Sequence, residues 1–402
     1  MNHLARRVAT PPAPAFAPAP SSDSGRPVAR PAPGLKTILV LAFGLACAGL
    51  AQAQLLVGQT TGVTGNSALN VAETTLGAKL WIDAVNARGG VNGSLVELRT
   101  LDDRGSATQA QANAKTLVER DQVLALFMIR GTPQNEAVLP LLDRYDIASI
   151  APSSGAMLLN SPVKRHVFNV RNSYQAEAER AIEQLVSMGS TRIAVLKTDD
   201  AFGDDCLAGA TRGFAKMHIA PAFVEGFDKA EPKFDDVAAR LKQTSAHAVI
   251  ILGTASSVVK ATRAIRAAGN GATVVTLSNN ASEGLVRELG ALARGVIVTQ
   301  VFPGENEITM PMIRDATRLL QARQPGARPS PAMIEGFAAA RVLTEALRRA
   351  GPHPTRKSVI AALDGMDDFD LGGVKVHYRE SDHSGVHYAD LSVIDERGRF
   401  RR

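Results

Sequence analysis

The sequence has few cysteines and few aromatic residues. Only two of its 402 residues are cysteine, Cys47 and Cys206, and aromatic side chains make up 4% of the chain. Cys47 lies in an apolar run near the N-terminus that has the features of an export signal, so the mature chain would keep one cysteine and form no internal disulfide. A binding site built mainly from stacked aromatic rings is excluded by the same scarcity.

An excess of one charge is also lacking once the N-terminus is set aside. The net charge is +6, but the first 53 residues hold five basic residues and one acidic residue. The remainder therefore carries 40 basic and 38 acidic groups, which is a net charge of +2. No basic stripe interleaved with aromatic residues follows, so nucleic acid is not an expected partner.

The apolar run near the N-terminus is too short to span a membrane, which takes about 20 apolar residues. It covers residues 37–51, follows Lys36 and ends at Ala51-Gln52-Ala53. This order predicts a secretory signal cleaved near Ala53–Gln54 and a periplasmic protein. Residues 1–34 are rich in Pro, Ala and Arg and are expected to be disordered, and the length of this leader suggests a start codon near Leu35. The residues before Cys47 fit a lipid-attachment motif poorly.

Beyond residue 53, short apolar runs alternate with amphipathic helical stretches, which predicts a parallel α/β sheet. The same rhythm occurs in residues 54–170 and 171–301, and 402 residues are too many for one ordinary core, so two lobes are expected. The strands are predicted at residues 55–59, 95–101, 123–129, 147–150, 167–170, 192–197, 222–225, 248–252, 273–277 and 296–301. Two more strands near the C-terminus, residues 374–378 and 391–394, are expected to be antiparallel.

Polar residues follow the apolar run that starts at Ile147. The run ends at Pro152, and Ser153, Ser154 and Gly155 come directly after it. Ligands of open parallel sheets bind beyond the carboxyl ends of the strands, so this triplet is a candidate ligand site, although its residue types alone would also fit an ordinary turn and helix cap. No nucleophile-elbow motif surrounds the serines, so catalysis is not indicated.

Three sharper motifs are incomplete. The glycine-rich stretch at residues 58–65 lacks the Gly-Lys-Ser/Thr ending of a phosphate loop. The four aspartates between residues 199 and 205 do not have the spacing of a calcium loop and are expected at a solvated rim. His383 and His387 lie in a stretch with the composition of a loop. No cofactor and no metal site are therefore predicted.

The order and spacing of these motifs resemble the periplasmic solute-binding proteins of the leucine/isoleucine/valine-binding type, which capture substrates for ABC importers. The resemblance covers essentially all of the mature chain. The matching stretches are residues 58–65, Gly77-Ala78, residues 86–93, Asp102-Asp103, residues 150–154, residues 168–171, Phe202-Gly203 and residues 336–340. Each stretch alone is weakly specific, and their order together carries the resemblance.

The resemblance implies the type I periplasmic binding fold. This fold is α/β, with two doubly wound parallel-sheet lobes joined by a three-strand hinge. We expect crossings near Val170, Phe302 and Asp367. The N-lobe would then be residues 54–170 and 303–366, the C-lobe residues 171–302 and 367–402, and residues 1–53 would be leader and signal peptide. The lobes would close by a hinge motion around a small ligand. The protein would be a monomer without enzymatic activity, and its partner an inner-membrane ABC permease.

Ligand-binding positions carried over from the family fall on both lobes. Those that would bind a carboxylate are Thr132, Ser153, Ser154 and Gly155. Hydroxyls and backbone N–H groups at a helix start are suited to that role. The positions of the C-lobe fall on Tyr174, Phe202, Thr254 or Ala255, and Asn280. Ser67 lies in a loop that could reach the cleft.

Two of these positions depart from the family pattern. Phe202 replaces a tyrosine and lacks its hydroxyl. Asn280 is neutral where branched-chain amino-acid binders have an acidic residue that pairs with the ligand ammonium, and a buried ammonium without a counter-charge is costly. The expected ligand is therefore a branched-chain amino acid or a related acid or amide, and a ligand without the α-ammonium stays open.

Two other functions are compatible with parts of this sequence. A sensor that feeds a chemoreceptor or kinase would share this fold, and the sequence does not separate it from a transport protein. A cytoplasmic regulator or enzyme is disfavoured by the export signal and by the lack of a recognisable DNA-binding segment.

Overall fold

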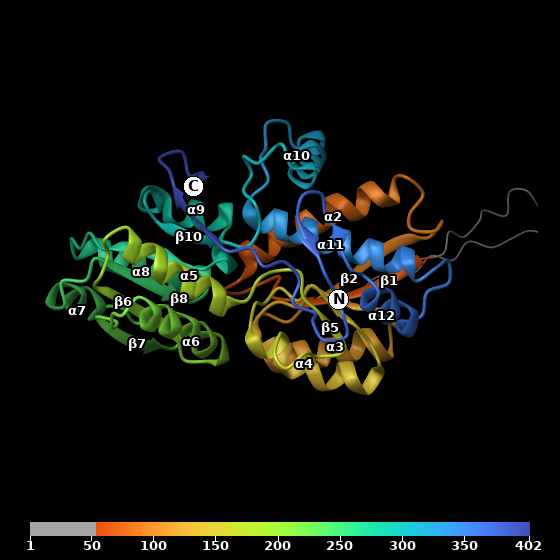
Figure 1. Ribbon diagram of the computed structural model, residues 1–402, viewed down its shortest axis with the longest axis horizontal. Helices are drawn as coiled ribbons and strands as arrows, with labels where there is room; N and C mark the ends of the chain where they lie inside the picture. The colour runs from red at the N-terminus through yellow and green to blue at the C-terminus, as the bar shows by residue number, and fades with distance from the viewer. Residues whose placement is uncertain (1–53) are drawn as a thin grey trace, which may run out of the picture. The chain divides into compact units, whose positions relative to one another are not determined.

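The computed structural model describes residues 54–402 (Figure 1). The predicted disordered leader, the signal peptide and Cys47 lie outside the described residues. Within residues 54–402, none of the helices combines the length and the apolar character that a membrane span requires.

The N-lobe contains a five-stranded parallel sheet in the order β2-β1-β3-β4-β5. The strands are β1 (Gln54–Thr61), β2 (Leu95–Asp102), β3 (Leu126–Phe127), β4 (Ser149–Ile150) and β5 (Val167–Phe168). The helices of the lobe are α2 (Ala68–Asn86), α3 (Ala107–Glu119), α4 (Thr132–Tyr145), α10 (Pro311–Arg323), α11 (Pro331–Arg349) and α12 (Arg356–Asp364). Most side chains of β1, β3, β4 and β5 are buried, as expected for parallel strands covered by helices on both faces.

The C-lobe contains a seven-stranded sheet in the order β14-β13-β10-β9-β8-β6-β7. Strands β6 to β10 pair in parallel, whereas β13 runs antiparallel to β10 and β14 antiparallel to β13. The strands are β6 (Ile193–Thr198), β7 (Phe223–Phe227), β8 (Ala248–Leu252), β9 (Thr273–Thr276), β10 (Ile297–Gln300), β13 (Asp390–Ile394) and β14 (Phe400–Arg401). The helices are α5 (Tyr174–Ser187), α6 (Ala201–Lys216), α7 (Val237–Gln243), α8 (Ala255–Ala267) and α9 (Glu283–Leu289). The predicted α/β class with two doubly wound lobes is confirmed.

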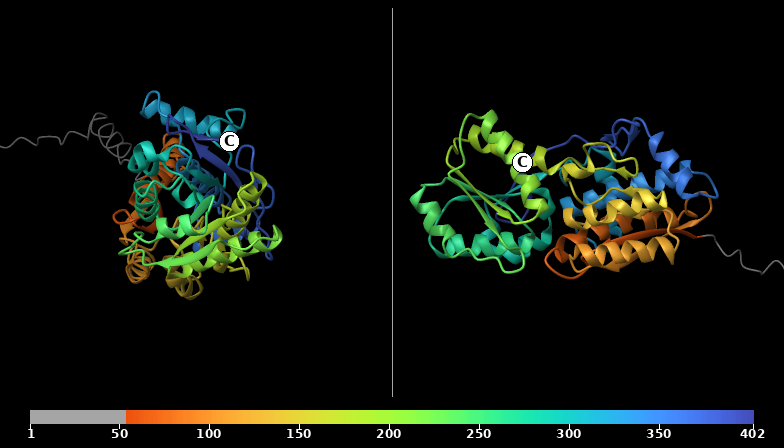
Figure 2. Two further views of the ribbon diagram at one scale, coloured as in Figure 1. Left: turned by 90° about the vertical axis from the view of Figure 1, so that its left-hand side faces the viewer. Right: turned by 90° about the horizontal axis from the view of Figure 1, so that it is seen from below.

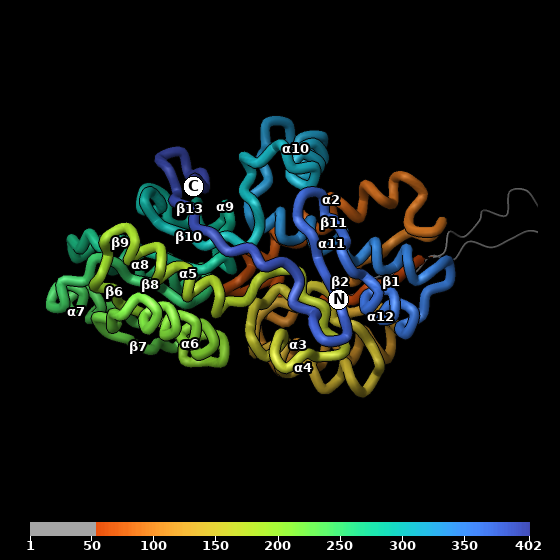
Figure 3. Tube along the Cα trace, in the orientation of Figure 1, coloured from red at the N-terminus to blue at the C-terminus, as the bar shows by residue number. Residues whose placement is uncertain are grey.

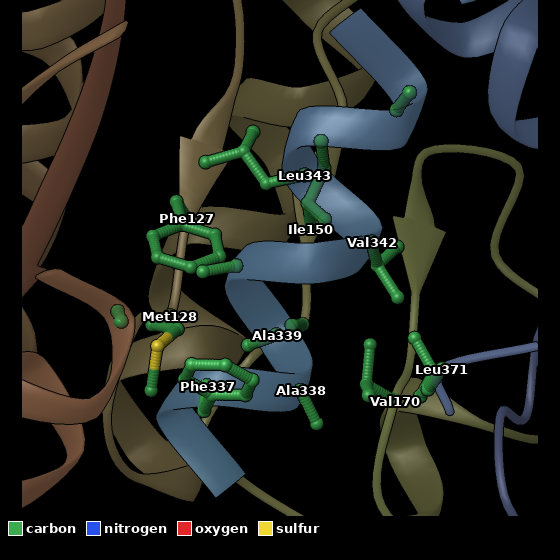
Figure 4. Close-up of a cluster of buried hydrophobic side chains, with 14 of the residues drawn as sticks. Phe127, Met128, Ile150, Val170, Phe337, Ala338, Ala339, Val342, Leu343 and Leu371 are labelled. Carbon is green, nitrogen blue, oxygen red and sulfur yellow. The ribbon is translucent and has the colours of Figure 1, made fainter. Parts of the chain in front are cut away.

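Segments far apart in sequence build the N-lobe core. Helix α11 packs between β3 and β4 on one side and the chain near Val170 and Leu371 on the other (Figure 4). The view from below separates the green elements of the C-lobe from the orange, yellow and blue elements of the N-lobe (Figure 2). The blue helices α11 and α12 therefore belong with β1 to β5, although more than 160 residues separate β5 from α11.

The chain after α12 stays with the N-lobe longer than the resemblance implied. Strands β11 (Phe369–Asp370) and β12 (Lys375–Val376) form a separate antiparallel hairpin, and Leu371 and Val386 belong to the N-lobe core. His383 is buried with its ring stacked on Phe168 at 4.2 Å between centroids, so it has a packing role. The Cα trace then runs on to β13 (Figure 3). A third crossing nearer residue 388 than Asp367 is favoured by this packing, and the division into lobes stays a proposal.

Candidate functional site

A pocket of about 100 Å³ lies between the two lobes, at the carboxyl ends of their parallel strands. The residues of its N-lobe wall follow β1, β2 and β3 or lie at the start of α4: Gly62, Asn66, Ser67, Asp103, Arg104, Gly105, Arg130, Gly131, Thr132, Pro133 and Gln134. The residues of its C-lobe wall lie near the ends of β6, β8 and β9 or on the segments around them: Tyr174, Thr198, Asp200, Phe202, Lys229, Thr254 and Asn279.

The structure brings half of the expected ligand-binding residues to this pocket. Thr132 comes from the start of α4, Tyr174 from the start of α5, Phe202 from α6 and Thr254 from the turn after β8. Ser67, whose loop was expected to reach the cleft, also lines it. Ser153, Ser154, Gly155 and Asn280 do not line the pocket. They lie directly behind residues that do, and their own part in ligand binding stays a prediction.

Ser153 and Ser154 support the side chains in front of them. The Ser154 hydroxyl lies 3.1 Å from the Thr132 hydroxyl. The Ser153 hydroxyl accepts a bond of 3.2 Å from Arg130 Nη1 and donates one of 3.1 Å to Glu335 Oε1. Both serines are buried and neither lines the pocket, so a ligand contacts them only through their neighbours in this arrangement.

Gly155 allows the segment that leads into α5 to pack closely against it. Its carbonyl accepts a 2.8 Å bond from the Tyr174 N–H. A Cβ at this position would lie 2.7 Å from both Asn172 O and Tyr174 N, so a larger residue would push Tyr174 out of place. The glycine thus positions an aromatic wall residue.

The aromatic part of the wall consists of Tyr174 and Phe202. Their rings meet edge to face, with centroids 5.0 Å apart and an interplanar angle of 90°. Arg171 lies 4.6 Å from the centroid of the Tyr174 ring. Burial raises the pKa of the Tyr174 phenol, which therefore stays neutral at physiological pH. Tyr174 is buried and Phe202 is half-buried, so Phe202 supplies most of the accessible apolar surface of this corner.

Asn279 takes the place in the pocket that the resemblance assigned to Asn280. The two residues end the short 3₁₀ turn Ser278–Asn280 after β9. Asn280 Nδ2 donates to Gly253 O at 2.9 Å and to Thr276 Oγ1 at 2.9 Å, both within the lobe. Asn279 lines the pocket instead.

Sequence reasoning also missed Arg130 and Lys229 as wall residues. Arg130 directly follows Ile129 at the end of the predicted strand, so the rule that found Ser153 could have found it. Lys229 lies after β7 and carried no comparable signal. Asp200, expected at a solvated rim, is less than one-fifth exposed and pairs with Lys229 at 2.7 Å.

Asp200 begins α6 as its N-cap residue and is expected to stabilise the protein in a pH-dependent manner. Burial alone would raise its pKa, but bonds from Lys229, the Gly203 N–H and the Thr198 hydroxyl hold the pKa of Asp200 below its usual value of 3.8. A lowered pKa means that the stabilisation is present above pH 3.8 and is lost as the pH falls through the folded-state value. Asn keeps the helix cap but removes the charge that pairs with Lys229, so we expect Asp200→Asn to lower the free energy of unfolding by about 1 kcal/mol at pH 7 and by less near pH 3. Urea titrations at both pH values measure this, and an equal loss at both would contradict it.

The lobes touch on several sides of the pocket. Arg130 Nη2 donates to Asn279 O at 2.8 Å, and Asn66 Nδ2 donates to Lys229 O at 3.3 Å. On α2, the Glu73 carboxylate accepts the N–H groups at the start of α9 at 3.0 and 2.8 Å. These hydrogen bonds join the N-lobe to the C-lobe around the pocket.

Comparisons with known proteins agree with this geometry. A family model described as periplasmic binding protein matches residues 54–399. An amino acid binding protein of Pseudomonas aeruginosa is 26% identical over 227 residues, which are 54% of this chain and 59% of that protein. The Leu/Ile/Val-binding protein of Escherichia coli K12 is 23% identical over 66% of this chain and 72% of its own.

Solved structures of other proteins share this fold. A substrate-binding periplasmic protein from Ralstonia solanacearum superposes with a TM-score of 0.80 at 30% identity and covers 86% of this chain and 99% of its own. A branched chain amino acid ABC transporter protein from Thermus thermophilus with bound valine has a TM-score of 0.76 at 20% identity, over 87% of this chain and 95% of its own.

Proposed function

Because this chain belongs to the family of periplasmic binding proteins, we propose that it is the substrate-binding component of an ABC importer and captures a small carboxylate-bearing solute between its lobes. The solute is an amino acid or a related acid or amide, and the partner is an inner-membrane permease. The protein works in the periplasm as a monomer and has no catalytic step.

One observation carries the proposal: the pocket has walls from both lobes and polar groups at the ends of parallel strands. Thr132 is the first residue of α4, so its hydroxyl and the N-terminal N–H groups of this helix lie at the N-lobe wall. Such groups bind anions because a helix start carries partial positive charge. On the other wall, Phe202 and Tyr174 offer apolar surface to the rest of the solute.

The positions of the serines support a binding role rather than a catalytic one. A serine nucleophile must reach the substrate, yet neither Ser153 nor Ser154 lines the pocket and their hydroxyls are engaged by protein groups. Cys206 is fully buried and burial raises the pKa of its thiol well above the ordinary value, so it is not a nucleophile either.

A thermal-shift screen of the exported protein tests the function. The panel holds amino acids, aromatic acids, hydroxy acids, amides and ureas, with sugars and nucleotides for comparison. A solute at a hundred times its Kd stabilises the folded protein by about 2.7 kcal/mol, which shifts the melting temperature visibly. We expect at least one carboxylate-bearing solute to do so.

A matched pair of variants makes the screen specific to the pocket. Thr132→Val removes a hydroxyl from the wall and should reduce the shift. Thr116→Val removes one from α3, where Thr116 binds Ala112 O outside the pocket, and should leave the shift unchanged. Hits confined to sugars or nucleotides, or no hit at all, would overturn the proposal.

A further inference from the structure

Arg130 is a buried cation with unused hydrogen-bond donors in the pocket wall. Arg130 is only 8% exposed. Its Nη1 donates to Asn70 Oδ1 at 2.9 Å and to Ser153 Oγ at 3.2 Å. Nη2 donates to Asn279 O at 2.8 Å. These three acceptors are uncharged, and a guanidinium has five N–H groups, so two find no protein acceptor within residues 54–402.

The carboxylate of Glu335, which is linked to Arg130 through one intervening hydroxyl, already interacts with another arginine. Glu335 is reached only through the Ser153 hydroxyl, and its other oxygen lies 3.7 Å from Arg171 Nη1. Across the described chain, Arg130 forms no direct ion pair. Buried charges are normally paired, so the open donors of Arg130 point to an anionic group supplied by the ligand.

Asn279 presents an unpaired acceptor beside this cation. Its Nδ2 donates to Gly253 O at 3.1 Å and to Asn280 Oδ1 at 3.3 Å, which fixes the orientation of the amide because Gly253 O can only accept. Asn279 Oδ1 is then buried without a donor among the described residues. A buried acceptor of this kind is satisfied by a ligand O–H or N–H.

The carboxylates of the wall are not open to a ligand ammonium. Asp103 is 0% exposed and accepts from the Thr60 hydroxyl at 3.0 Å and the Gly105 N–H at 2.9 Å. Asp200 is neutralised by Lys229. An ammonium at Asn279 would therefore face a neutral amide oxygen, which is costly in a buried site, whereas a hydroxyl would not.

We propose that the solute is a 2-hydroxy acid whose carboxylate pairs with Arg130 and whose 2-hydroxyl donates to Asn279 Oδ1. This inference rests on the proposed function and names the class of its substrate. Arg130 Nη2 is hydrogen-bonded to the backbone O of Asn279, and both residues line the same pocket, so one small molecule in that pocket can contact both of them. The side chain of the acid lies against Tyr174 and Phe202.

Calorimetric titration with matched acids tests the class. Three sets each hold a 2-hydroxy acid, the amino acid of the same skeleton and the acid with hydrogen at that carbon: lactate, alanine and propionate; 2-hydroxy-4-methylpentanoate, leucine and 4-methylpentanoate; phenyllactate, phenylalanine and 3-phenylpropionate. We expect a hydroxy acid to bind at least tenfold more tightly than both partners of its set. Equal or tighter binding of the amino acid, or no binding of any hydroxy acid, overturns the inference. The proposed function survives either result if another carboxylate-bearing solute of the thermal-shift panel binds.

Substitutions at the two residues separate their roles. Arg130→Gln should weaken binding of the hydroxy acid and of the deoxy acid by a similar factor, about tenfold to a hundredfold, because both carboxylates lose their charge pair. Asn279→Asp should reverse the order and favour the amino acid, since it supplies the missing counter-charge. Thr116→Val, on α3 outside the pocket, is the control and should leave the order of affinities unchanged.

A second variant guards against misfolding of the aspartate variant. Asn279→Ala should lower the affinity for the hydroxy acid to that for the deoxy acid. The affinity for the deoxy acid itself should change by no more than about threefold. An Asn279→Ala protein that still prefers the hydroxy acid tenfold would show that another group binds the hydroxyl, and would overturn the assignment.

Discussion

Replacing Gly336 by alanine is expected to lower the free energy of unfolding by about 3 kcal/mol or more. Gly336 lies on α11 where this helix crosses α2, and a Cβ there would come within 1.8 Å of Thr74 O. On the facing helix, a Cβ at Gly77 would lie 2.0 Å from Met333 O. Both close contacts are with backbone atoms, so the helices themselves would have to move apart. Urea unfolding followed by circular dichroism measures the loss.

Gly271→Ala is the matched control for this substitution. Gly271 has nothing within 4 Å of the position of a Cβ and no positive φ, so the same added methyl group should change stability by less than 1 kcal/mol. A Gly336→Ala protein as stable as the Gly271→Ala protein would mean that the crossing of α2 and α11 adjusts freely and does not fix the N-lobe core.

The order of elements could be predicted because buried parallel strands produce a strong signal. The apolar runs that predicted strands at residues 192–197 and 248–252 coincide with β6 and β8 within one residue. The run at residues 123–129 gave only the two-residue β3, although Leu124 N still bonds to Leu56 O of β1. Tertiary packing decides how much of such a run keeps regular pairing, and the sequence does not contain that information locally.

The position of the candidate site could be predicted from the sequence, but its side chains could be predicted only in part. Strand ends pointed to the correct edge of both sheets, since parallel strands bring their carboxyl ends together. Which of two neighbours faces the pocket was not predictable for Asn279 and Asn280, because they lie in a 3₁₀ turn where no strand or helix period sets the direction. Ser153 was similarly expected at the surface of the site, whereas Arg130 from the neighbouring strand end covers it.

Arg171→Met is expected to cost about 3–5 kcal/mol of stability, because it leaves buried carboxylates without their counter-charge. Arg171 follows the first crossing between the lobes and is 2% exposed. It forms an ion pair with the fully buried Glu177, and its Nη1 lies 3.7 Å from Glu335 Oε2. Burial alone would lower the pKa of Arg171, but the two glutamates raise it above the ordinary value, so the guanidinium is charged at every relevant pH.

Arg212→Met is the control for loss of an exposed ion pair. Arg212 pairs with Glu179 at 3.0 Å with half of its side chain exposed, and its removal should cost less than 1 kcal/mol. Both variants are compared with the unmodified protein by urea unfolding at pH 7. Equal losses of stability would contradict the view that loss of the buried Arg171 pair costs more than loss of the exposed Arg212 pair.

A double variant separates the loss of the pair from the cost of leaving one charge alone. Glu177 also accepts from the Ser278 N–H at 3.0 Å and from the Thr299 hydroxyl, so it stays hydrogen-bonded when Arg171 is absent but remains a buried anion. Removing that charge by Glu177→Gln in the Arg171→Met protein should restore about 1–2 kcal/mol. The contrary result is that Glu177→Gln destabilises the Arg171→Met protein as much as it destabilises the unmodified protein. The two residues would then act independently. In that case the buried pair would not explain how the chain is fixed where it enters the C-lobe.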